Sequence, residues 1–149
     1  MSKELEIILK QFGQKVSDAV SLVEASLGRV GNFDPKKDYT PEEREPYDAL
    51  CDRFIRAVET CIKFLKTYEI HMYGEKSETL RDLMLRMEKL EMISSLDIWF
   101  RMRDVRNRIV HDYLPEEIQA LYNDIKQSFA QELIRLKARI ESELKIDSL

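Results

Sequence analysis

The stretch from Arg103 to Tyr113, RDVRNRIVHDY, gathers side chains that can bind phosphate and move protons. Arginine stays charged at physiological pH and grips phosphate oxygens with paired N–H donors. Histidine titrates near neutrality and can serve as a base or an acid. Arg106 and His111 are therefore candidates for chemistry at a phosphate group.

A local cluster of positive charge surrounds this pair. The 149-residue chain has 24 Lys and Arg against 28 Asp and Glu, a net charge of -4, so the whole protein is not a nucleic-acid-binding cation. Any contact with RNA or DNA must come from a local patch. Four arginines form a candidate patch, opposed in the local sequence only by Asp104: Arg101, Arg103, Arg106 and Arg108. The alternative interpretation of such a run is a solvated helix face.

The composition predicts an all-helical protein. Charged residues make up 35% of the chain, and the helix breakers Gly and Pro occur only four times each. The length suits a single domain over residues 1–149. The sequence contains neither a run of about eighteen apolar residues nor a signal-peptide layout, so we expect a cytoplasmic protein without a membrane partner. Cys51 and Cys61 would lie about 15 Å apart along one helix, too far to bond each other, and are expected to be buried thiols.

Apolar periodicity and boundary signals predict five helices in an up-and-down bundle. Thr40 and Pro41 resemble a helix start, Gly74 a helix end, and Pro115 a break. The expected helices cover about 3–27, 41–71, 77–91, 94–112 and 115 to near the C-terminus, and the longest loop follows the first of them.

Successive residues of an α-helix are rotated by about 100°, and this rotation divides the fourth predicted helix into three faces. The face expected to meet the core carries Ile98, Met102, Val105 and Ile109. A half-buried flank carries Trp99, Arg106 and Val110. A polar strip nearly opposite the core carries Asp104, Asn107 and His111.

Arg106 and His111 are about 140° apart around this helix, so one helix does not aim both at a single atom. Two copies that meet across a twofold axis could bring their arginines and histidines into one cleft. The alternative is a lone surface histidine beside a helix pair of Asp104 and Arg108.

Residues 106–113, RNRIVHDY, match the Arg-x4-His-x-Tyr motif of the HEPN superfamily, and the chain resembles its HepT-like branch. The polar Asn107 after the arginine, the helical bundle and the motif at the end of the fourth helix agree with that branch. The resemblance implies a HEPN-like bundle and a metal-independent endoribonuclease toxin. Such toxins form homodimers in which two motifs line one cleft. Their partner is an MntA-like nucleotidyltransferase antitoxin, which transfers AMP to the motif tyrosine and blocks the site.

The resemblance also implies roles for individual residues. Arg106 and His111 become the catalytic candidates, Asn107 and Asp104 supporting residues, and Tyr113 the site of AMP transfer. The remaining arginines of the patch become RNA-binding candidates: Arg101, Arg103 and Arg108. The nucleophile would be the 2′-hydroxyl of the RNA itself. No metal or cofactor is expected, because the sequence has no Cys/His cluster at ligand spacing.

Two other functions compete with the toxin. A related branch of the superfamily consists of non-enzymatic subunits that bind substrate for a separate nucleotidyltransferase, and residues 79–108 resemble that branch as well. The tyrosine two residues after His111 favours HepT, although a tyrosine at a helix end often just packs its ring. The third possibility is a plain helical dimer whose arginines are solvated.

Overall fold

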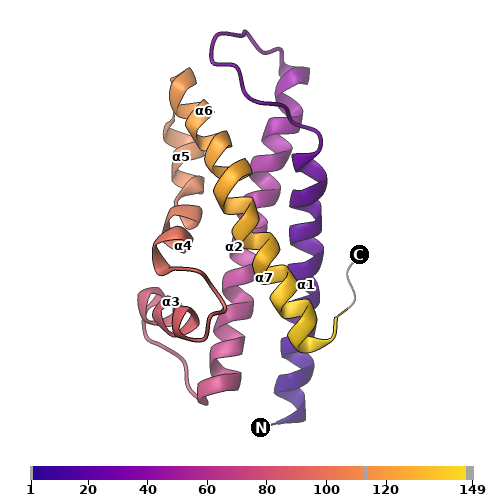
Figure 1. Ribbon diagram of the computed structural model, residues 1–149, viewed down its shortest axis with the longest axis vertical. Helices are drawn as coiled ribbons and strands as arrows, with labels where there is room; N and C mark the ends of the chain where they lie inside the picture. The colour runs from indigo at the N-terminus through magenta and orange to yellow at the C-terminus, as the bar shows by residue number, and fades with distance from the viewer. Residues whose placement is uncertain (1, 113, 147–149) are drawn as a thin grey trace.

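The computed structural model describes residues 2–112 and 114–146, which fold into a helical bundle without strands. Helices α1 (Lys3–Leu27) and α2 (Pro41–Tyr73) run antiparallel, as Figure 1 shows. Three short helices, α3 (Leu80–Lys89), α4 (Leu96–Arg103) and α5 (Val105–His111), return along α2. The chain then descends through α6 (Pro115–Asp124), the π-helical segment η1 (Ile125–Phe129) and α7 (Ala130–Leu144). The all-helical prediction is confirmed.

The ends of α2 follow the signals in the sequence. Glu43 N donates to Thr40 Oγ1 and Thr40 N donates to Glu43 Oε1, which completes a capping box. Gly74 ends the helix at a φ of 73°, a left-handed conformation that glycine adopts without strain.

The third predicted helix starts later than expected. Helix α3 begins at Leu80 behind the N-cap Thr79, and not at Ser77. Ser77 instead donates its N–H and its hydroxyl to the buried carboxylate of Glu69, which also pairs with Arg86 at 3.1 Å. These contacts hold residues 74–79 as a loop against α2.

The fourth predicted helix is divided at Asp104 into α4 and α5. Asp104 has a ψ of -11°, whereas a regular α-helix has about -42°. The buried side chains Trp99, Met102 and Val105 recur every three residues, and the tighter turn at Asp104 keeps Val105 in the core. The expected faces were therefore partly wrong. Trp99 is buried instead of half-buried, and Ile109 is 37% exposed instead of facing the core.

An aromatic cluster fixes the long loop at one end of the bundle. The Phe33 ring stacks on Tyr39 at 4.8 Å between centroids and also contacts Tyr47 of α2 and Tyr122 of α6. This cluster therefore ties the loop and α2 to α6.

The core contains the sulfur-bearing side chains expected there. Cys51 and Cys61 are buried free thiols, and Met84 and Met87 are buried in the same core. None of the helices built from the described residues combines the length and apolar composition that crossing a bilayer requires.

Candidate functional site

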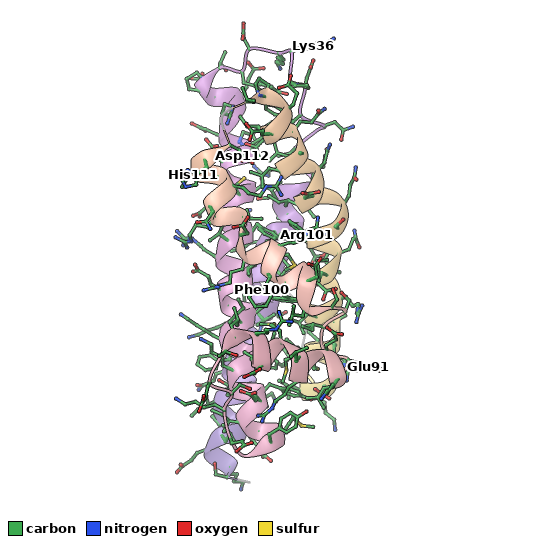
Figure 2. The ribbon with its side chains drawn as sticks, turned by 90° about the vertical axis from the view of Figure 1, so that its left-hand side faces the viewer. Lys36, Glu91, Phe100, Arg101, His111 and Asp112 are labelled. Atoms are coloured by element: carbon green, nitrogen blue, oxygen red, sulfur yellow. The ribbon has the colours of Figure 1, made fainter. Side chains whose placement is uncertain are left out.

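Helix α5 presents most of the motif on the surface of the bundle. Val105 is fully buried and anchors the start of the helix, while Arg106, Asn107 and His111 are exposed. Figure 2 shows His111 at the end of this helix and Phe100 and Arg101 further along the same side, on α4. Tyr113 lies outside the described residues.

Arg106 is held by a residue of another helix. Its Nη2 lies 2.5 Å from Glu59 Oε1 on α2, and the two side chains are 62% and 55% exposed. An exposed ion pair contributes little to stability because water screens both charges. The guanidinium is thus oriented by Glu59 and is still accessible to another anion such as phosphate.

Asp104 and Asn107 form a pair of their own. Asn107 Nδ2 donates to Asp104 Oδ1 at 3.0 Å, across one turn. The bond leaves the amide oxygen of Asn107 available as an acceptor beside Arg106. Asp104 therefore supports Asn107, and not the Arg108 side chain with which a helix pair was considered.

Arg108 clamps α5 to α6. Its Nη1 lies 2.8 Å from Asp124 Oδ2, and its Nε lies 3.5 Å from Asp112 Oδ2. The Arg108 side chain is only 24% exposed. Two carboxylates already pair with the guanidinium, so this position favours a structural role over RNA contact.

The other two arginines of the predicted patch differ in their surroundings. The guanidinium carbon of Arg101 lies 5.6 Å from the centroid of the Phe129 ring, a cation–π contact with η1. Arg103 is exposed at the end of α4 and lines a groove together with Arg106. Arg103 and Arg106 are thus brought together, whereas Arg101 and Arg108 have separate partners.

A groove of about 400 Å³ runs between α2 and the α4–α5 break, and we call it the motif groove. The apolar residues of its lining are the half-buried Ile55 and Phe100 and the buried Val58, Ile62 and Met102. Polar residues from three helices and the break complete it: Glu59, Arg103, Asp104, Arg106 and Asn107. His111 is not among its lining residues.

Apolar side chains lie exposed next to His111. Val110 is 61% exposed and Leu114 is 60% exposed, on either side of the histidine in sequence. Pro115 starts α6 directly afterwards, so the predicted break is confirmed. Exposed apolar residues beside polar candidates mark a surface suited to a protein partner.

Sequence reasoning missed the residues that hold the motif in place. Glu59 and Asp124 are distant in sequence from the arginines they pair with, and no local spacing signals such contacts. Within the described ranges, no three His, Cys, Asp or Glu side chains come together as a metal would need.

The model of one protein family, described as nucleotidyltransferase substrate binding protein like, matches residues 15–142. The chain belongs to this family. The matched residues include helices α2 to α6 and therefore Arg106 and His111. The family's description associates its members with a nucleotidyltransferase. Among curated proteins, no match to the chain is found.

Proposed function

We propose that this chain is a HepT-like ribonuclease toxin that acts as a homodimer and is blocked by a nucleotidyltransferase antitoxin. One observation carries the proposal: Arg106 and His111 are exposed on α5 directly beside the exposed apolar side chains Val110 and Leu114. A second copy that covers the apolar residues would bring two arginines and two histidines close together. The family's association with a nucleotidyltransferase supports the same assignment.

The reaction uses the nucleophile that RNA carries. One His111 imidazole takes the proton of a ribose 2′-hydroxyl, and the oxygen attacks the adjacent phosphorus. The bond from phosphorus to the 5′-oxygen breaks, that oxygen takes a proton from the solvent, and the imidazolium of His111 then returns its proton to the solvent. The products are a 2′,3′-cyclic phosphate and a 5′-hydroxyl. Arg106 exchanges its exposed ion pair with Glu59 for the phosphate and offsets the negative charge that grows on the phosphoryl oxygens.

The antitoxin acts on Tyr113. Transfer of AMP to the phenol adds a negative phosphate and a bulky nucleoside two residues from His111. That group competes with the phosphate of the RNA for Arg106 and fills the space beside the imidazole. The toxin is thereby inactive wherever its partner is present, and we place both in the cytoplasm.

A second candidate function is a non-enzymatic subunit that binds substrate for the nucleotidyltransferase. The family's description favours it, and so does the engagement of Arg106 by Glu59 and of Arg108 by Asp112 and Asp124. In that case the exposed surface of α5 would contact the transferase or its substrate, and no RNA would be cleaved.

Cleavage of RNA by the purified protein in EDTA separates the two candidates. The ribonuclease loses at least about a hundredfold in rate in His111→Ala and Arg106→Ala, the usual scale for an acid–base group or a charge-stabilising donor. His71→Ala is the matched control, because it removes the chain's other histidine, in the last turn of α2. Cleavage that persists in both motif variants would rule out the proposed site. Purified protein that cleaves no RNA would favour the substrate-binding subunit.

A further inference from the structure

The motif groove is larger than a site for one phosphate needs to be, and the proposed reaction at Arg106 and His111 gives no role to its apolar lining. Its volume of about 400 Å³ lies within the range of small-molecule sites. The groove exists because the chain turns at Asp104, which separates α4 from α5 next to α2. Arg106 and Asn107 line it, so the groove is continuous with the motif.

We propose that the motif groove binds one base of single-stranded RNA, next to the phosphate held by Arg106, and that this base stacks on Phe100. The inference deepens the proposed ribonuclease function and rests on it for the position of the phosphate. It adds a binding residue, Phe100, and a recognition site for the nucleotide adjacent to the cleaved bond.

The lining matches the two surfaces of a nucleobase. Ile55 of α2 is half-buried and gives one wall an aliphatic surface above the buried Val58 and Ile62, and Phe100 adds an aromatic residue from α4. Single-stranded RNA is recognised mainly by stacking of splayed bases on aromatic side chains, with hydrogen bonds to the base edges. Phe100 is half-buried and packs against the core, and it also lines the groove, so the packing anchors it at the proposed stacking position.

The charges of the groove also fit a base better than a second phosphate. Two arginines are balanced by two carboxylates, Glu59 and Asp104, so the lining is neutral overall. Carboxylates accept hydrogen bonds from the amino and imino groups of bases, and the Asn107 amide can both donate and accept. When an RNA phosphate takes Arg106, Glu59 is released from its ion pair and becomes an acceptor for the base in the groove.

Binding of RNA can be measured without cleavage in a His111→Ala background. A fluorescein-labelled single-stranded RNA of mixed sequence is titrated with this protein, and anisotropy gives the dissociation constant. Adding Phe100→Leu should weaken binding about tenfold, the loss expected when one base loses its aromatic platform. Phe100→Tyr keeps an aromatic ring and should bind within about twofold of the parent.

Phe12→Leu is the matched control. Phe12 is also a half-buried phenylalanine packed against the core, but it lies on α1 and does not line the groove. It should leave the dissociation constant unchanged, and thermal unfolding of each variant verifies that all are folded. Equal affinity of the Phe100→Leu and parent proteins would overturn the inference, as would the absence of RNA binding by the parent.

The two proposals fail in different ways. If wild-type protein cleaves RNA and Phe100→Leu neither weakens binding nor raises KM, the base site is wrong and the ribonuclease assignment stands. If wild-type protein cleaves nothing while Phe100→Leu still weakens binding about tenfold, the groove binds RNA and the ribonuclease assignment is wrong.

Discussion

Trp99 and Glu132 are joined by a buried hydrogen bond in which Trp99 Nε1 donates to Glu132 Oε2 at 2.8 Å. The same oxygen accepts from Ser94 N at 2.9 Å, just before α4 begins. Trp99 is 1% exposed and Glu132 is 6% exposed. One carboxylate of α7 therefore fixes both the start and the rotation of α4, and with them the wall of the motif groove that carries Phe100.

Replacing Glu132 with alanine should destabilise the fold by about 2–4 kcal/mol, because the buried indole N–H of Trp99 and the backbone N–H of Ser94 lose a charged acceptor. Urea unfolding followed by the fluorescence of the chain's single tryptophan measures the loss directly. Glu45→Ala, at an exposed position of α2, is the matched control and should change stability by no more than about 0.5 kcal/mol. A Glu132→Ala protein as stable as this control would mean that the bond does not hold α4.

The contact between Trp99 and Glu132 is also an example of what the sequence alone did not predict. Helix positions and caps were predictable because Thr40, Gly74 and Pro115 act through local backbone chemistry. The rotation of α4 about its axis was not predictable, because it depends on a hydrogen-bond acceptor 33 residues away in the sequence. No Gly or Pro at Asp104 signals the turn there in the sequence. The turn follows from the burial of Val105.

The candidate site was predictable only in part. Exposure of His111 and Asn107 followed from their distance around the helix from Met102 and Val105, which are buried. The partners of the arginines did not follow, since Glu59 and Asp124 reach them through the tertiary fold. The groove depends on the packing of three helices and has no signature in local spacing.

The stability of the protein should fall steeply at alkaline pH. Burial raises the pKa of the Cys51 thiol to about 12 and also raises the pKa of Cys61 and of the Tyr68 and Tyr122 phenols. In the unfolded chain thiols ionise near pH 8.5 and phenols near pH 10. The folded state then retains more protons than the unfolded state, so the free energy of unfolding decreases as pH rises above about 8.5.

Urea unfolding at a series of pH values measures this decrease. Each buried thiol contributes a slope of up to about 1.4 kcal/mol per pH unit between its unfolded and folded pKa. Cys51→Ala should make the decline between about pH 8.5 and pH 10 shallower, because one titrating thiol is gone. A free energy of unfolding that stays constant from pH 8 to pH 10.5 would show that the thiols are not protected by burial.

The exposed apolar residues beside His111 should be required for association of two copies. Val110→Asp together with Leu114→Asp places charges in the proposed interface and should convert a dimer into monomers with loss of RNA cleavage. Leu22→Asp is the control, because Leu22 is 50% exposed on α1, away from α5. Light scattering gives the mass of each variant, and an intact dimer of the double variant would place the contact elsewhere.

Co-expression with the proposed nucleotidyltransferase antitoxin should add AMP-sized increments to the intact mass of this chain. These increments should disappear in Tyr113→Phe and remain in Tyr73→Phe, which removes a tyrosine that is 41% exposed at the end of α2. Modified protein should no longer cleave RNA. Increments that persist in Tyr113→Phe would move the modification to another residue.

The most direct test of a shared catalytic cleft mixes two inactive proteins. Arg106→Ala and His111→Ala subunits are combined, exchange of subunits is verified by native mass spectrometry, and RNA cleavage is measured. If one subunit supplies the arginine and the other the histidine, mixed dimers hold one intact Arg106 and one intact His111 in the same cleft, and cleavage returns. If mixed dimers form and stay as inactive as either parent while the wild type cleaves, the two subunits do not share a site.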